Sequence, residues 1–146
     1  MKIAIGCDHG GYLLKQDILI WMEEHDIDFE DVGCFSTESV DYPVYAEKVA
    51  RAVAAGACDK GIVICTTGIG VSMAANKVGG VRCALCTDCL QAEMTRRHND
   101  ANALCMGGRV VGPGLACQLV DLFLNTPFEG GRHEKRIAKL MAIENR

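Results

Sequence analysis

An α/β fold built on a parallel sheet is predicted by the way apolar residues are arranged along the chain. Short, continuous apolar runs such as Lys2–Cys7 and Lys60–Thr66 have the length of buried strands. Most of these runs are followed by a stretch in which apolar residues recur every three or four positions, as in an amphipathic helix. The 146 residues, 49% hydrophobic and 23% charged, suit one domain with its own core.

The first segment reads as strand, helix and strand. Lys2–Cys7 is expected to be a buried strand, and Asp28–Val32 a weaker one that closes at Gly33. Between them, Tyr12–His25 is expected to be helical because its larger apolar residues follow helical spacing. These residues are Leu14, Ile18, Trp21 and Met22.

The second segment contains a helix, a strand and a further helix. Pro43 suits the first turn of a helix, and Gly56 suits its end. The apolar face of this helix consists of Ala46, Val49, Ala50 and Val53. Lys60–Thr66 is the clearest core strand of the chain, and glycines then lead into a helix of small residues, Val71–Lys77.

The last segment contains two strands, Arg82–Cys86 and Ala103–Met106, and three helices. Asp88 can cap the first of these helices, with Gln91 three residues further on. Apolar spacing from Leu115 to Phe123 predicts the second helix, which stops before Pro127. The three helices are expected over about 88–98, 115–126 and 133–143.

This order of elements predicts a three-layer αβα sandwich in a single domain, residues 1–146. Its centre is a Rossmann-like five-stranded parallel sheet with helices on both faces, and a further helix follows at the C-terminus. Ligands of such sheets bind beyond the carboxyl ends of the strands. The loops after residues 6, 65, 86 and 106 are therefore the candidate positions for a site.

Charge and cysteine usage exclude several classes of protein. The net charge is −4, although the segment from Gly130 onward carries five basic and two acidic residues. An acidic chain of this kind is not expected to bind nucleic acid. Nine cysteines cannot pair completely within one chain, and neither a secretory signal nor an apolar run long enough for a membrane span is visible. We therefore expect a cytoplasmic protein with free thiols, not a disulfide scaffold or a membrane protein.

The loop after the third strand, residues 65–70 (CTTGIG), is the strongest candidate for chemistry. Glycines at a helix start allow backbone N–H groups to approach an anion, and the same dipoles favour the thiolate of a nearby cysteine. Cys65 is thus either a reactive thiol or a small apolar residue that closes the strand. The spacing of a dinucleotide-binding loop fails, because its third glycine would fall at Met73.

Two further segments carry polar side chains, each with a functional and a structural interpretation. Residues 6–11 (GCDHGG) place Asp8 and His9 at a strand end, to contact a polar ligand or to cap the turn. His98 closes a helix, where an imidazole is often only a partner of the helix dipole.

Two more features also have both a functional and a structural interpretation. Arg132 and Arg136 share one helix face, as a phosphate clamp or as a solvated basic face. The spacing of Cys83, Cys86 and Cys89 resembles a metal site, but the first two should point to opposite faces of a strand, so no metal is expected.

Several short motifs, in this order and spacing, resemble the type B ribose-5-phosphate isomerase family, which also contains galactose-6-phosphate and allose-6-phosphate isomerases. The resemblance covers almost the whole chain. Its motifs are residues 6–9 (GCDH), 41–43 (DYP), 65–70 (CTTGIG), 74–77 (AANK), 98–100 (HND), 108–112 (GRVVG) and 129–133 (EGGRH) with Arg136.

The resemblance implies an aldose–ketose isomerase that uses no metal or organic cofactor. By this analogy Cys65 is the base that moves a proton between C1 and C2, and His98 opens the sugar ring. Thr67 and the backbone N–H groups of Gly68, Ile69 and Gly70 surround the enediolate oxygen. Sugar hydroxyls or the ring oxygen are held by Asp8, His9, Tyr42 and Asn99, and the phosphate by Arg132 and Arg136, with Arg109 as a helper. The family is dimeric, with a tetramer as an alternative, and both subunits contribute to each site.

One residue departs from the family pattern, which usually has glycine after the catalytic cysteine where this chain has Thr66. A β-branched residue adds bulk to the substrate pocket beside the base and restricts the backbone. Ribose 5-phosphate is the expected substrate, and a six-carbon sugar phosphate or a free sugar is the alternative. A non-catalytic binding or redox module of flavodoxin-like fold is a further alternative, although few aromatic residues (5%) are present to enclose a flavin.

Overall fold

The computed structural model describes residues 1–145 and contains a five-stranded sheet whose neighbouring strands are all parallel. Its strands are β1 (Lys2–Cys7), β2 (Asp28–Asp31), β3 (Lys60–Cys65), β4 (Cys83–Leu85) and β5 (Ala103–Gly107). They lie in the order β2-β1-β3-β5-β4. The predicted five-stranded parallel sheet is confirmed, and β1, β3 and β5 are its three central strands.

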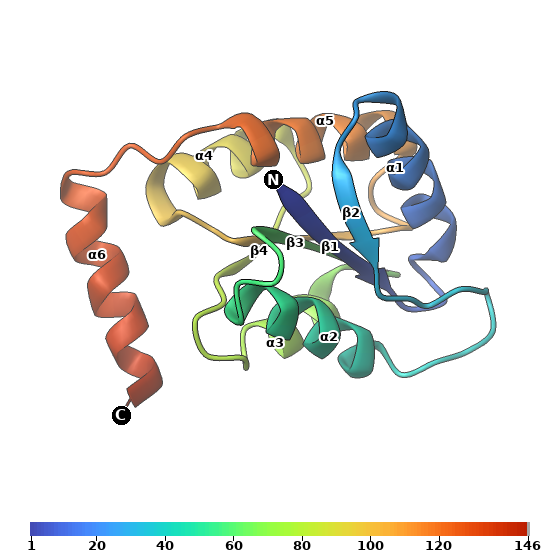
Figure 1. The fold of residues 1–146 in the computed structure, drawn as a ribbon, viewed down its shortest axis with the longest axis horizontal. Helices are drawn as coiled ribbons and strands as arrows, with labels where there is room; N and C mark the ends of the chain where they lie inside the picture. Colours follow the sequence, from blue (N-terminus) through green and yellow to red (C-terminus); the bar gives the residue numbers. More distant parts are fainter. Residues whose placement is uncertain (146) are drawn as a thin grey trace.

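Helices cover both faces of this sheet (Figure 1). They are α1 (Tyr12–Glu24), α2 (Tyr42–Ala54), α3 (Ile69–Ala75), α4 (Cys89–Asn99), α5 (Pro113–Asn125) and α6 (Arg132–Met141), followed by a 3-10 turn, Ala142–Asn145. Helices α1, α4 and α5 form one layer and α2 and α3 the other, whereas α6 stands away from the sheet beyond α4. The predicted three-layer αβα sandwich with a C-terminal helix is confirmed. No helix within residues 1–145 has the length and apolarity needed to span a membrane.

The two faces of the central strands carry side chains of different size. Successive residues of a strand point to opposite faces. Large side chains such as Ile5 and Ile64 therefore belong to the core under α1 and α5. On the α2 face the strands present small residues, and a Cβ added to Gly61 would lie 2.6 Å from Val49. Helix α2 consequently packs close to the sheet, and Cys65 lies on this face.

Strand β4 is shorter than the predicted Arg82–Cys86. The backbone N–H of Arg82 donates to the Asn102 side-chain oxygen at 2.7 Å. The ladder therefore begins one residue later, at Cys83. The Asp88 cap is confirmed, because its carboxylate accepts the Gln91 N–H at 2.8 Å at the start of α4.

A buried ion pair fastens α1 to the segment that leads to α2. Lys15 is fully buried, and its Nζ donates to both carboxylate oxygens of Asp31, at 2.7 and 2.9 Å, and to the Cys34 carbonyl at 2.6 Å. Replacing one member of such a pair leaves the other desolvated and without its counter-charge. We expect Lys15→Met to lower the free energy of unfolding by about 3 kcal/mol, measured by urea denaturation at a fixed protein concentration.

The matched control for this prediction is Lys2→Met. Lys2 Nζ also lies 2.7 Å from a carboxylate, that of Glu30, but both side chains are exposed to solvent. Exposed pairs contribute little to stability because water screens them. Equal urea midpoints for the two variants would contradict the assigned role of the buried pair.

Candidate active site

The loops that follow β1, β3 and β5 meet at the carboxyl edge of the sheet. Gly108 N–H donates to the Cys65 carbonyl at 2.7 Å, and Arg109 N–H donates to the Thr66 carbonyl at 3.1 Å. A Cβ added to Gly10 would lie 1.9 Å from Thr66 Oγ1, so the loop after β1 touches the loop after β3. The structure therefore brings together the predicted residues of these three loops at the position where α/β sheets bind ligands.

Cys65 is the last residue of β3, and its sulfur accepts a hydrogen bond from the Gly68 N–H at 3.1 Å. A thiolate accepts such a bond better than a thiol does. The turn that provides the donor needs glycine, because Gly68 has a φ of +80° and a Cβ there would lie 2.5 Å from Leu85.

Other thiols near the strand ends are in a different environment. Burial raises the pKa of Cys7 and that of Cys86 to about 12. Both side chains therefore remain thiols near neutral pH. Cys65 is thus the strand-end cysteine whose sulfur receives a backbone N–H donor from a glycine-rich turn.

Basic groups from two of these loops line a cavity of about 510 Å³ at this edge. Its walls include His9, Thr66 and Arg109. His9 Nδ1 accepts the Val40 N–H at 3.2 Å, so this nitrogen carries no proton and the ring N–H is on Nε2. The cavity therefore combines an imidazole donor with a guanidinium, which are suitable groups for an anionic or polyhydroxylated ligand.

The remaining predicted residues of this edge differ in the contacts that their side chains make. Asp8 is buried, and its Oδ1 accepts the N–H groups of Gly10 and Gly11 at 2.9 and 3.1 Å. It therefore closes the turn before α1, but the N-cap of this helix is Gly11 and not Asp8. The ring of Tyr42, at the start of α2, packs against Gly70. Thr67 Oγ1 accepts the Ile69 N–H at 3.3 Å. Two of the three predicted N–H donors, those of Gly68 and Ile69, are therefore already engaged in this structure.

A second group of predicted residues gathers on α4 and α6. His98, Asn99 and Arg136 line a cavity of about 370 Å³ together with His133. Arg132, at the first position of α6, lies close enough to His133 to affect its titration. Arg132 and Arg136 both belong to α6 and are four residues apart, so they share one face of this helix, as predicted.

The two groups lie at opposite edges of the sheet. Helix α4 connects two parallel strands and so runs against them, which brings His98 near the start of β5, at Ala103. Cys65 pairs with Gly107, at the end of the same strand. Five residues of strand separate these positions by about 13 Å. Within one chain, the Cys65 group and the His98 group therefore lie apart; we call them the two half-sites.

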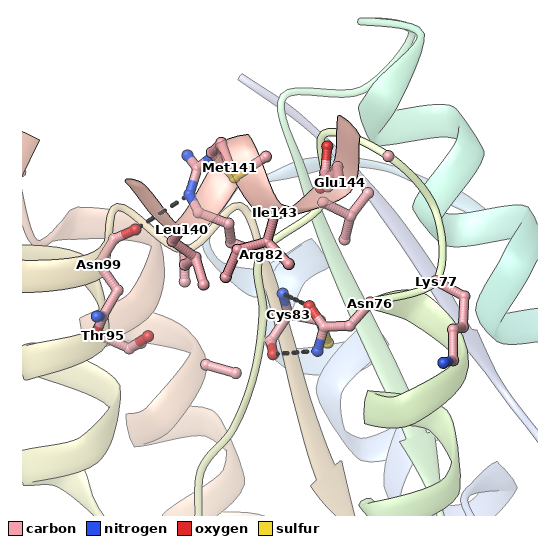
Figure 2. Close-up of a pocket in the computed structure, with 14 residues that line it drawn as sticks. Asn76, Lys77, Arg82, Cys83, Thr95, Asn99, Leu140, Met141, Ile143 and Glu144 are labelled. Atoms are coloured by element: carbon pink, nitrogen blue, oxygen red, sulfur yellow. Dashed lines mark hydrogen bonds between the residues drawn. The ribbon is translucent and has the colours of Figure 1, made fainter. Parts of the chain in front are cut away.

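A groove of about 750 Å³ runs beside the second half-site, between α6 and the segment that joins α3 to β4. Figure 2 shows Leu140, Met141 and Ile143 along one wall and Cys83 on the other side, with the Arg82 side chain reaching Met141, Nη1 to Sδ 3.6 Å. Arg82 Nε donates to the Asn99 carbonyl at 3.1 Å, and the Asn76 amide exchanges two hydrogen bonds with the Cys83 backbone. Leu140 and Ile143 remain about half exposed, so one wall of the groove is apolar and uncovered.

Within residues 1–145, one group of three metal-ligating side chains has its ligand atoms within 4.8 Å of one another: His98, Glu129 and His133. The two imidazole rings are stacked, with centroids 4.3 Å apart and planes inclined by 10°. Nitrogen lone pairs lie in the ring planes, so two nearly parallel, stacked rings cannot direct both toward one ion. Cys83 and Cys86 pack in core clusters on opposite faces of the sheet, as strand geometry predicts.

Sequence reasoning assigned no role to Glu129 or His133, although both lie in a motif that carries the family resemblance. Glu129 Oε2 lies 3.8 Å from His98 Nε2 and 3.5 Å from His133 Nε2. The available signal was the presence of an acid and an imidazole, Glu129 and His133, in the same short motif as Arg132.

Comparisons with known proteins show the family of this chain. The sequence profile of the family described as Ribose/Galactose Isomerase matches residues 3–140. Ribose-5-phosphate isomerase B of Escherichia coli K12 is 48% identical over 145 residues, which is 99% of this chain and 97% of that protein.

Two solved structures have the same fold over nearly the whole chain. Ribose-5-Phosphate Isomerase B of Clostridium thermocellum has a TM-score of 0.98 at 52% identity, covering 99% of this chain and 98% of that one. Ribose-5-phosphate Isomerase B of Mycoplasma genitalium, solved with bound ribulose-5-phosphate, has a TM-score of 0.94 at 40% identity, with coverages of 99% and 97%. The predicted class of enzyme, an aldose–ketose isomerase, is confirmed, and the chain belongs to the Ribose/Galactose Isomerase family.

Proposed function

We propose that this chain interconverts ribose 5-phosphate and ribulose 5-phosphate through an enediolate, with Cys65 as the base. The observation that carries the proposal is the Cys65 sulfur at a strand end with a backbone N–H donor, at the same edge of the sheet as a cavity lined by His9, Thr66 and Arg109. The relatives named above include a structure with bound ribulose-5-phosphate. Thr66 adds bulk at the same edge, which favours a five-carbon over a six-carbon sugar.

In the proposed reaction the Cys65 thiolate removes the proton from C2 of the open-chain aldose. The C–H electron pair becomes the C1–C2 double bond of the enediolate, and the carbonyl electrons move to O1. Protonation of C1 by the Cys65 thiol, with proton transfer between O2 and O1, then gives the ketose. A positioned base contributes about 10²–10⁴-fold to such a step. Thr67 and the N–H of Gly70 are the groups proposed to face the developing oxyanion.

Ring opening must come before this step, because the aldose is largely a closed furanose. We assign it to His98, which is partly exposed and can exchange protons between the C1 hydroxyl and the ring oxygen. Asn99 lies next to it, whereas Asp8, His9 and Tyr42 come from the other half-site and are assigned to the sugar hydroxyls and ring oxygen.

Because these half-sites lie at opposite edges of the sheet, we propose a dimer in which each site takes Cys65 from one copy and His98 from the other. The uncovered apolar wall formed by Leu140 and Ile143 supports an association through α6. Monomer mass in light scattering at assay concentrations would contradict this assembly.

The phosphate is assigned to Arg132 and Arg136, with Arg109 from the other half-site as a helper. Hydrogen bonds to charged groups contribute about 1.5–3 kcal/mol each. We expect Arg136→Ala to lower kcat/KM for ribose 5-phosphate by about 10- to 100-fold. Steady-state rates of ketose formation measure this effect.

The matched control is Arg51→Ala, which removes an exposed arginine paired with Glu47 on α2 and should leave kcat/KM unchanged. Wild-type protein is also assayed on allose 6-phosphate, galactose 6-phosphate and free ribose. A higher kcat/KM for a hexose phosphate would overturn the ribose assignment. An unchanged kcat/KM in Arg136→Ala would overturn the phosphate assignment.

A further inference from the structure

Outside the Cys65 half-site, three ionisable side chains lie against one another: His98, Glu129 and His133. The His98 ring stacks on that of His133, with centroids 4.3 Å apart. The carboxylate of Glu129 lies against both rings, 3.8 Å from His98 Nε2 and 3.5 Å from His133 Nε2. Glu129 is itself held by Arg97, whose Nε lies 2.5 Å from Oε1 and whose carbonyl accepts the Glu129 N–H.

The two imidazoles differ in their access to water. The His98 side chain is 38% exposed, whereas that of His133 is 6% exposed. A charged ring loses hydration on burial, and two stacked cations repel each other. The pKa of His133 is lowered, first by burial and then by the charges of His98 and Arg132.

Cations surround this pair. The charged groups that face it are Arg97 on α4, Arg132 and Arg136 on α6, and Glu129 in the segment between α5 and α6. Arg132 and Arg136 contribute to the lowered pKa of His133. Glu129 is the one anion among these groups. Its carboxylate lies against both imidazole rings, where it offsets the positive charge of the arginines.

We propose that Glu129 and His133 are positioning residues for His98: the carboxylate offsets the arginines so that His98 can take up a proton, and the buried, stacked His133 stays neutral and holds the ring orientation. This inference rests on the proposed function, because it gives His98 its proton in the presence of the arginines assigned to the phosphate.

The test is an NMR titration of the four histidine imidazoles in the protein without substrate, in wild type, Glu129→Gln and His98→Gln. In wild type, His133 should titrate at a lower pH than His98. In Glu129→Gln, both midpoints should fall, that of His98 by about half a pH unit or more. In His98→Gln, the midpoint of His133 should rise, because the competing cation is absent. His25, stacked on Trp21 in α1, is the internal control and should not move.

An unchanged His98 midpoint in Glu129→Gln, or a His133 that titrates above His98, would overturn the proposal. The pH profile of kcat/KM is recorded for the same Glu129→Gln variant and for His133→Phe, which keeps a stacked ring without a titratable group. The profile of Glu129→Gln should move to lower pH by the NMR shift, and His133→Phe should keep kcat within a few-fold, whereas His133→Ala should not. If the NMR midpoints move and the pH profile does not, the ring-opening role of His98 fails while the positioning inference stands.

Discussion

Cys65→Ala should lower kcat for ribose 5-phosphate isomerisation by at least about 10³-fold. The thiolate is the group assigned to take the C2 proton, and no other acid or base of the Cys65 half-site is assigned that step. Cys65→Ser should also be slow, because a hydroxyl is a much weaker base at neutral pH than a thiolate. Solvent deuterium uptake at C1 of ribulose 5-phosphate, followed by NMR, should be lost together with the isomerisation.

The matched control for this prediction is Cys117→Ala, which removes a half-buried thiol on α5, on the opposite face of the sheet from Cys65. It should keep wild-type kcat. Because Cys65 is almost fully buried, circular dichroism and the urea midpoint must show that Cys65→Ala is folded. A folded Cys65→Ala protein with more than a tenth of wild-type kcat would exclude the thiol as the base.

The strands and helices were predictable from local apolar patterns. The runs at Lys2–Cys7 and Lys60–Cys65 have no competing interpretation, and Pro43 and Asp88 mark helix starts that the structure confirms. Strand order was not predictable, because it depends on pairing between residues far apart in the chain. The shortened β4 depends in the same way on a side chain, Asn102, that displaces the ladder at Arg82.

The candidate site was predictable as a set of residues, but not as an arrangement. Parallel-sheet geometry correctly placed Cys65 and His9 at the carboxyl edge. The same geometry implies that a helix between two strands ends at the opposite edge, which is where His98 lies. Glu129 and His133 could not be assigned, because their role depends on burial and ring stacking that no local pattern encodes.

The proposed division of the site between two copies predicts a rescue of activity in mixed dimers. Cys65→Ala and His98→Gln homodimers should each be nearly inactive. In a heterodimer of the two chains, one site contains both substitutions and the other contains neither. Co-expression with two different affinity tags and sequential purification isolates that heterodimer. It should have about half the wild-type kcat per dimer, because an isologous pair holds two equivalent sites.

A second heterodimer provides the matched control: one chain carries both Cys65→Ala and His98→Gln, and its partner is wild type. Each of its sites then lacks one of the two groups, so it should be nearly inactive. The most direct test of the proposed mechanism is therefore the ratio of kcat between these two heterodimers. Half activity in the first and almost none in the second is the predicted result, and the reverse would show that Cys65 and His98 of the same chain act on one substrate.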